Sequence, residues 1–182
     1  MRQALLVLLA LSGLAPLARA ATLPRGTEDF RLGWASSQVD SALEARGVEV
    51  LSRGFDFITT AGEAADVEYV MYSFATTPLG PSFLWKVTVA YRVPYGRDRF
   101  ETLRDALVGN LGRPGEVHAS DPKAGSFDDR VTWADERTAV QLGARWNDPQ
   151  DPRVDRMILT WTDRRLQKLV EVQRRNKKNQ KP

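Results

Sequence analysis

The hydrophobic pattern of the chain is clearest around residues 100–114. Four apolar side chains recur there at the offsets of one helix face: Phe100, Leu103, Leu107 and Leu111. Gly112 can end this helix, and Pro114 prevents its continuation. A helix with one apolar face must be covered, and the strand-like runs on either side predict that a sheet covers it.

A shorter helix is predicted near the start of the chain, over residues 37–46. Ser37 and Asp40 have the spacing of a capping box, and Gly47 can end the helix. Its apolar stripe is weaker than that of the later helix but has the same offsets. We therefore expect two helices that each precede a group of strands.

Alternation of apolar and polar residues predicts six strands, in two groups of three. The runs span residues 48–58, 67–74, 83–93, 130–134, 138–146 and 156–162. Gly54 interrupts the first run, and we interpret it as a bulge. The second run is apolar on both faces, so it is either covered twice or partly exposed for a partner. The segment 115–126 is rich in Gly, Pro, Asp and Ser, and we expect a loop there.

This element order predicts an α+β fold. Two tandem helix–three-strand units, at residues 30–93 and 94–163, are expected to form one antiparallel sheet with the helices packed on one face. A short C-terminal helix is predicted from Asp163, and residues 30–172 are expected to form a single domain.

The first 20 residues are typical of a signal peptide. Arg2 precedes an apolar run, and Ala18-Arg19-Ala20 matches an A-x-A cleavage site. The alternative is a membrane anchor, but the run is shorter than the roughly 20 residues that a spanning helix needs. We expect cleavage between Ala20 and Ala21, an extended lead-in over residues 21–29, and a periplasmic or secreted chain without a transmembrane segment. The sequence contains no cysteine, which excludes disulfides and cysteine-based chemistry.

The basic residues are concentrated at the C-terminus. Residues 164–182 contain eight Lys or Arg and one Glu, although the formal charge of the whole sequence is only +3. We predict a disordered basic tail over residues 173–182, because this segment lacks large apolar residues. An anionic envelope surface is a candidate partner for five tail side chains, namely Arg174, Arg175, Lys177, Lys178 and Lys181. The alternative is a solubilising terminus without a partner. Nucleic acid is not expected as a partner, because the chain is predicted to be exported.

Several features together resemble a class of exported proteins built from a helix followed by a β-meander. They are the turn Phe30…Leu32-Gly33, the run Phe83-x-Trp85-x-Val87-x-Val89-x-Tyr91, the helix Phe100-x-x-Leu103-x-x-x-Leu107 leading into Leu111-Gly112-x-Pro114, and the Trp133 strand. The β-lactamase inhibitor protein has this unit twice, and the small lipoprotein of the outer-membrane barrel-assembly machinery has it once. The resemblance covers most of residues 30–163 and implies a non-catalytic protein that works by binding another protein. Because the chain has no cysteine, it lacks the disulfides of the inhibitor and the lipidated cysteine of the lipoprotein.

Few residues indicate chemistry. His118 is the only histidine in the sequence. To act as a general base it would need a nucleophile and an orienting acid within about 3 Å. Ser120 and Asp121 are close to it in sequence, but this does not establish such an arrangement in space. Two aspartate clusters lack the spacing of a calcium loop: Asp121, Asp128 and Asp129, and Asp148, Asp151 and Asp155. We therefore predict a protein without enzymatic activity, metal or cofactor.

The leading functional hypothesis is a protein-binding module of the cell envelope that uses an open sheet face and hairpin loops. The candidate surface residues lie on strand faces opposite the clearest core positions: Tyr72, Phe74, Lys86, Thr88, Gln141, Arg145 and Thr160. The loop over residues 76–81 is a second candidate surface. Two rivals stay open, namely an exported hydrolase with a carboxylate or His118 site, and an envelope-surface protein held by its basic tail.

Overall fold

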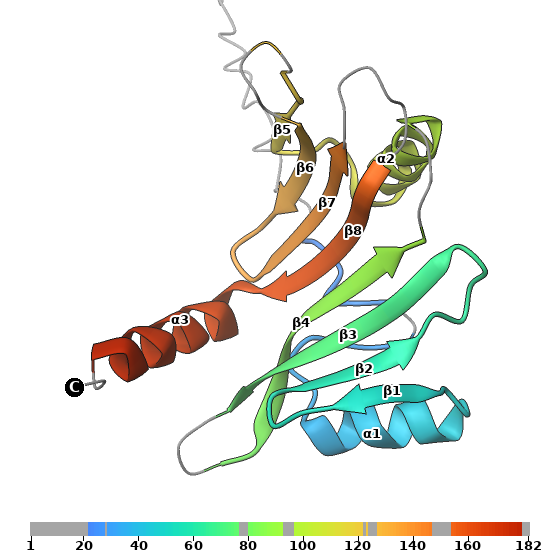
Figure 1. Cartoon of the computed structure of the whole chain (residues 1–182). Coiled ribbons are helices and arrows are strands. Elements are labelled where there is room, and N and C mark those ends of the chain that lie inside the picture. Colours follow the sequence, from blue (N-terminus) through green and yellow to red (C-terminus); the bar gives the residue numbers. More distant parts are fainter. Residues whose placement is uncertain are drawn as a thin grey trace, which may run out of the picture.

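The structure is a computed structural model with an α+β fold, in which three helices accompany an eight-stranded antiparallel sheet (Figure 1). It describes residues 22–27, 29–76, 80–92, 97–121, 123, 127–146 and 154–179. The predicted signal peptide, loop residues 77–79 and Lys181 lie outside the described residues.

All eight strands join one sheet in the order β1-β2-β3-β4-β8-β7-β6-β5. The strands are β1 (Val50–Arg53), β2 (Phe57–Ala61), β3 (Val67–Thr76), β4 (Ser82–Tyr91), β5 (Glu116–His118), β6 (Asp128–Ala134), β7 (Thr138–Trp146) and β8 (Val154–Asp163). The first four strands form one meander and the last four form another. The two meanders meet at the antiparallel pair of β4 and β8, which lies at the centre of the sheet.

Each group contains four strands and not the predicted three. The run over residues 48–58 is two strands, because the chain turns at Gly54, whose backbone N–H donates to the carbonyl of Phe57 over 2.9 Å. A Cβ on Gly54 would lie 2.2 Å from the Phe57 ring, so a larger residue at this turn would force the ring to move. The fourth strand of the second group, β5, lies in the predicted loop. It is only three residues long and all three are exposed, which is too short for a periodic signal.

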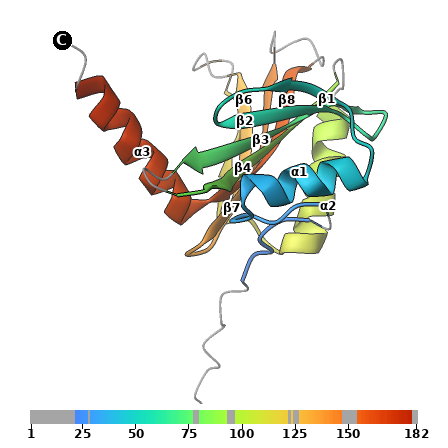
Figure 2. The same ribbon diagram turned by 90° about the horizontal axis from the view of Figure 1, so that it is seen from below.

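Helices α1 (Ser36–Ala45) and α2 (Arg97–Leu111) cover the same face of the sheet, as Figure 2 shows. Val39 and Leu43 of α1 are buried in the core, and so are Phe100 and Leu107 of α2. The α1 cap differs from the prediction, because the Ala35 backbone N–H donates to the Gln38 side chain. The prediction of two helices on one sheet face is correct for α1 and α2.

The end of α2 fits tightly against the second meander. Gly112 follows the helix with φ +80°, a conformation that favours glycine, and its N–H donates to the Val108 carbonyl over 2.9 Å. The Gly112 carbonyl accepts a hydrogen bond from the indole Nε1 of buried Trp133 at 2.8 Å. The predicted stop at Gly112 is therefore confirmed, and it also fixes the helix to β6.

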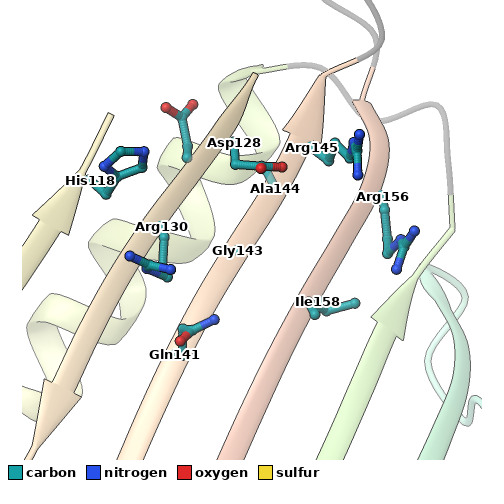
Figure 3. A pocket seen from close by; sticks show the side chains of 10 residues that line it. His118, Asp128, Arg130, Gln141, Gly143, Ala144, Arg145, Arg156 and Ile158 are labelled. Atoms are coloured by element: carbon teal, nitrogen blue, oxygen red, sulfur yellow. The ribbon is translucent and has the colours of Figure 1, made fainter. Parts of the chain in front are cut away.

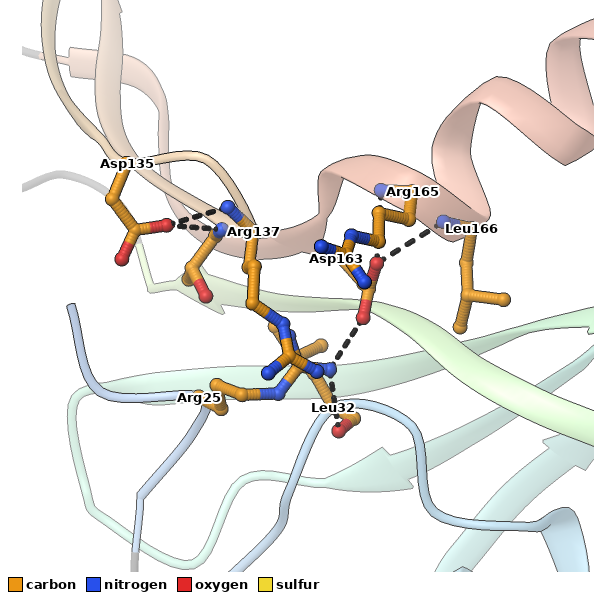
Figure 4. A network of polar contacts seen from close by, with 8 residues as sticks. Arg25, Leu32, Asp135, Arg137, Asp163, Arg165 and Leu166 are labelled. Carbon is orange, nitrogen blue, oxygen red and sulfur yellow. Dashed lines mark hydrogen bonds and ion pairs between the residues drawn. The ribbon is translucent and has the colours of Figure 1, made fainter. Parts of the chain in front are cut away.

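The segment before α1 is packed into the fold by a polar network at the start of α3 (Figure 4). Arg25 forms an ion pair with buried Asp163 and donates to the Leu32 carbonyl. Asp163 also accepts from the backbone N–H groups of Arg165 and Leu166, and so caps α3. The predicted lead-in thus contributes directly to the packing of the domain.

Helix α3 (Arg164–Asn179) is longer than predicted and lies apart from α1 and α2. It contacts β3, β4 and β8, and the Gln173 side chain donates to the Thr76 carbonyl at 2.6 Å. Val170 is buried there, outside the main core cluster. The prediction of disorder from residue 173 is wrong for residues 173–179. Their Arg, Lys and Gln are good helix formers, and positive charge near a helix C-terminus is favourable.

Candidate functional site

The face of the sheet opposite α1 and α2 carries the candidate site. Cross-strand pairing fixes which residues share this face, because Val87, Trp161 and Val140 point into the core and their neighbours point away. We call the part of this opposite face formed by β5, β6, β7 and β8 the open face. Among the described residues, no helix makes extensive contact with β5, β6 or β7 on this face.

A hollow of about 260 Å³ lies on the open face (Figure 3). Its polar lining comes from four adjacent strands, with His118 on β5, Asp128 and Arg130 on β6, Gln141 and Arg145 on β7, and Arg156 on β8. We call it the arginine hollow. It lies at the start of β8, away from Asp163, where α3 begins.

The three arginines of the hollow are exposed side chains in closely related register positions. Arg145 is the direct cross-strand partner of both Asp128 and Arg156. Arg130 lies one pleat further along β6, and its guanidinium is 3.5 Å from the Glu116 carboxylate. Like charges that face each other across strands repel, so the Arg145–Arg156 pair costs stability, and Asp128 across from Arg145 offsets only part of this cost.

Gly143 forms the floor of the arginine hollow. It lies in the middle of β7 between Leu142 and Ala144, where glycine weakens a strand. A Cβ at this position would meet its nearest neighbour at 3.8 Å, which is ordinary contact, so packing does not demand glycine. Glycine within a strand often marks a place where a ligand approaches the backbone closely.

Asp129, beneath the hollow, has a structural role. This buried carboxylate accepts from the Trp146 indole at 2.8 Å and the Ser120 backbone N–H at 2.6 Å, and it pairs with Arg97 at 3.2 Å. The Arg97 guanidinium lies 4.3 Å from the Trp146 ring centroid. The contacts of Arg97 with Asp129 and Trp146 hold α2 to the sheet. The Asp129 carboxylate is thus used for packing within the fold.

His118 lies at the rim of the hollow on the edge strand β5. Its side chain is exposed, and its direct cross-strand partner is Arg130. The hollow around it is open and not enclosed. Among the described residues, no three His, Cys, Asp or Glu side chains form a group that could hold a metal ion. Of the second aspartate cluster, whose spacing did not fit a calcium loop, Asp148 and Asp151 lie outside the described residues.

Two predicted surface residues, Tyr72 and Phe74, belong to the core. Each has 5% of its surface exposed, and the Tyr72 ring meets Phe30 edge-on with centroids 6.3 Å apart. Burial raises the pKa of Tyr72. The surface assignment fails because β3 is apolar on both faces. Alternation alone could not show that the segment before α1 covers the Tyr72 side.

Three other predicted residues lie on the predicted side of the sheet but are poorly accessible. Thr88 and Thr160 are buried, at 6% and 7% exposure. Lys86 is half-buried beside α3, and its pKa is lowered by burial and then by the charge of Arg174. None of the three lines the hollow, although Thr160 pairs across strands with Gln141.

Gln141 and Arg145 are the predicted residues that the structure brings into the hollow. Sequence reasoning missed Arg130 and Arg156, although the alternation held the signal. Val131 and Met157 are core positions, so their neighbours Arg130 and Arg156 must point to the other face. The predicted second group of three strands already contains β6, β7 and β8. What the sequence did not show is that β5 joins them at the edge of the sheet and brings His118 to the rim of the hollow.

The basic tail is separate from the hollow. Arg174 and Arg175 are exposed on α3, and Lys177 and Lys178 fall within the same helix. The described helices include none long and apolar enough to cross a membrane.

Comparisons with known proteins give no further guide to the site, because no family model, curated protein or solved structure matches the chain.

Proposed function

We propose that this chain is a non-catalytic binding module of the cell envelope that engages a protein partner through the open face. One observation carries the proposal. Charged and polar side chains from four adjacent strands converge on a shallow hollow of the sheet face that α1 and α2 leave uncovered. Such a surface can dock a partner without closing around a substrate.

The arrangement of the carboxylates favours binding over hydrolysis. A hydrolase of the rival kind needs an acid and a base held at a fixed spacing, or a histidine oriented by a carboxylate. Here the buried carboxylate, Asp129, is engaged by Trp146, Ser120 and Arg97. The exposed one, Asp128, has an arginine as its cross-strand partner on β7.

The proposal includes two features inferred from the sequence. The first is export, through cleavage of a signal peptide near Ala20-Ala21. The second is a tandem repeat, in which each unit is a helix followed by a meander. The element order supports it, since α1 precedes β1–β4 and α2 precedes β5–β8, with the last strands of the two units paired. The resemblance to helix-plus-meander binding proteins agrees with both features.

Site-specific photo-crosslinking tests the proposal. A crosslinking amino acid at Gln141 would sample the open face, and one at Glu101, exposed on α2, would serve as the matched control. In cells that express the protein naturally, we expect a discrete protein adduct from position 141 and none from position 101. Equal adducts from both positions, or none from position 141, would reject the open face as the binding surface.

A further inference from the structure

The arginine hollow has a charge balance that points to a particular ligand group. Glu116 lies 3.5 Å from Arg130 and largely balances its charge. Asp129 also lines the hollow, and Arg97 pairs with it at 3.2 Å. The remaining charged groups of the described lining are Arg145, Arg156 and Asp128, which together carry one net positive charge. Among the described residues, no ion pair involves Arg145 or Arg156. The hollow is therefore complementary to a monoanion, and a dianion would leave an excess of negative charge beside Asp128.

Shape and lining agree with a small group. The volume of about 260 Å³ is below the roughly 300–1,000 Å³ of sites for drug-sized molecules. Gly143 leaves the backbone bare at the floor, and Ile158 provides an apolar wall. A carboxylate on a short aliphatic stem fits these features, because its oxygens can face the guanidinium groups while its methylenes pack against Ile158.

From these observations we propose that the arginine hollow binds one carboxylate group of the protein partner, held by Arg145 and Arg156 and seated over Gly143. The group is an Asp or Glu side chain, or the C-terminal carboxylate of a chain. A carboxylate between the two guanidinium groups replaces their cross-strand repulsion with charge-assisted hydrogen bonds. The inference rests on the proposed function, since it names the chemistry by which the partner is recognised.

Titration with short peptides tests this inference without knowledge of the partner. The probes are acetyl-Gly-Glu-Gly-amide, acetyl-Gly-Gly-Gly with a free C-terminus, acetyl-Gly-Gln-Gly-amide and inorganic phosphate. The readout is the NMR shift of the Gly143 amide and of the Arg145 and Arg156 Nε–H groups. We expect saturable shifts with at least one carboxylate peptide, whose identity distinguishes a side chain from a C-terminus, and none with the Gln peptide.

Three variants sharpen the titration. Arg145→Gln or Arg156→Gln should weaken the peptide affinity by about tenfold or more, as expected for loss of a charged hydrogen-bond partner. Gly143→Val should abolish the shifts by filling the floor of the hollow. The matched control is Arg31→Gln, an exposed arginine outside the hollow, and it should bind like the wild type.

Two results would overturn the inference: no saturable shift with either carboxylate peptide, or tighter binding of phosphate than of both peptides. Failure of the inference and failure of the proposed function are distinguishable. If the Gln141 crosslink persists in Arg145→Gln/Arg156→Gln, the open face is a binding surface but the carboxylate assignment is wrong. If the wild-type protein gives no Gln141 crosslink, the proposed function itself is wrong.

Discussion

At the scale of single residues, two aspartates join the start of the domain to its end. Asp163 pairs with Arg25 and caps α3. Asp135 accepts backbone hydrogen bonds from Thr138 at 2.6 Å and from Leu23 at 2.7 Å. Burial opposes ionisation of Asp135, but hydrogen bonds from Thr138, Arg137 and Leu23, with the charge of Arg164, together lower its pKa.

The lowered pKa of Asp135 predicts a pH-dependent contribution to stability. A depressed folded-state pKa stabilises the fold above the unfolded value of 3.8, and the contribution is lost as pH falls through the folded pKa. Asp135→Asn should therefore lower the free energy of unfolding by about 1 kcal/mol at pH 7. Denaturant unfolding should show the difference from wild type shrinking at pH 3. A difference that is the same at both pH values, or that also occurs in the exposed control Glu101→Gln, would contradict this account.

The burial of Tyr72 gives a second prediction at this scale. Tyr72→Ala should lower the free energy of unfolding by about 3 kcal/mol, because it opens a cavity against Phe30. The control is Tyr69→Ala on the same strand, where the half-buried side chain points to the other face and the loss should be clearly smaller. Chemical denaturation measures both, and equal losses would show that Tyr72 does not occupy the core position described.

Residue-level reasoning predicted faces well only where one face of a strand was polar. Gln141 and Arg145 alternate with Val140 and Leu142, so the sequence alone predicts their common face. Tyr72 lies on a strand with two apolar faces. It is buried because the segment around Phe30, far earlier in the sequence, covers its side of the sheet, and no local pattern encodes this contact. Leu84 is fully buried because the β3–β4 register shifts between Ser73 and Phe74, an irregularity that simple alternation does not predict.

At the scale of elements, α3 packs on the sheet outside the main core cluster. Val170 and the Gln173 side chain attach it to the sheet, and its later turns carry Arg174 and Arg175. Figure 1 shows it leaving the end of β8 and extending away from both meanders. A basic helix that projects in this way can approach an anionic surface while the domain stays folded.

Truncation after Gln173 tests this role of the tail. The change keeps Val170 and the Gln173 hydrogen bond, so the free energy of unfolding should change by no more than about 0.5 kcal/mol. We predict that the intact chain associates with vesicles of anionic lipid at low salt and that the truncated chain does not, since each Lys or Arg near such a surface contributes about 1 kcal/mol. Sedimentation with vesicles measures the association of the intact and the truncated chain. Equal association of the two would show that the tail does not bind an anionic surface.

Elements with a strong period or a clear stop were predicted closely. The predicted strand 138–146 is β7, and Gly112 ends α2 as expected. The elements that were missed are short or lie at a tight turn. β5 has three exposed residues, and the β1–β2 hairpin turns within a few residues at Gly54, where a bulge and a turn have the same sequence signal.

At the scale of the whole molecule, one sheet separates two environments. On one side, α1, α2 and the segment around Phe30 enclose the aromatic core. On the other side, α3 covers the end near Thr76, and the opposite end carries the arginine hollow. The predicted second group of strands places β8 beside β7, and this pairing brings Arg156 beside Arg145. The missing information for this site was strand β5, which adds His118 to the rim of the hollow.

Recognition of a partner by the arginine hollow is tested by the yield of the Gln141 photo-crosslink in a charge-reversed background. We expect Arg145→Glu/Arg156→Glu to reduce the adduct to background, because the open face would then repel an acidic group. The matched control Arg31→Glu should leave the yield unchanged. If the doubly reversed protein keeps wild-type thermal stability and gives an adduct of undiminished yield, the arginine hollow does not recognise the partner.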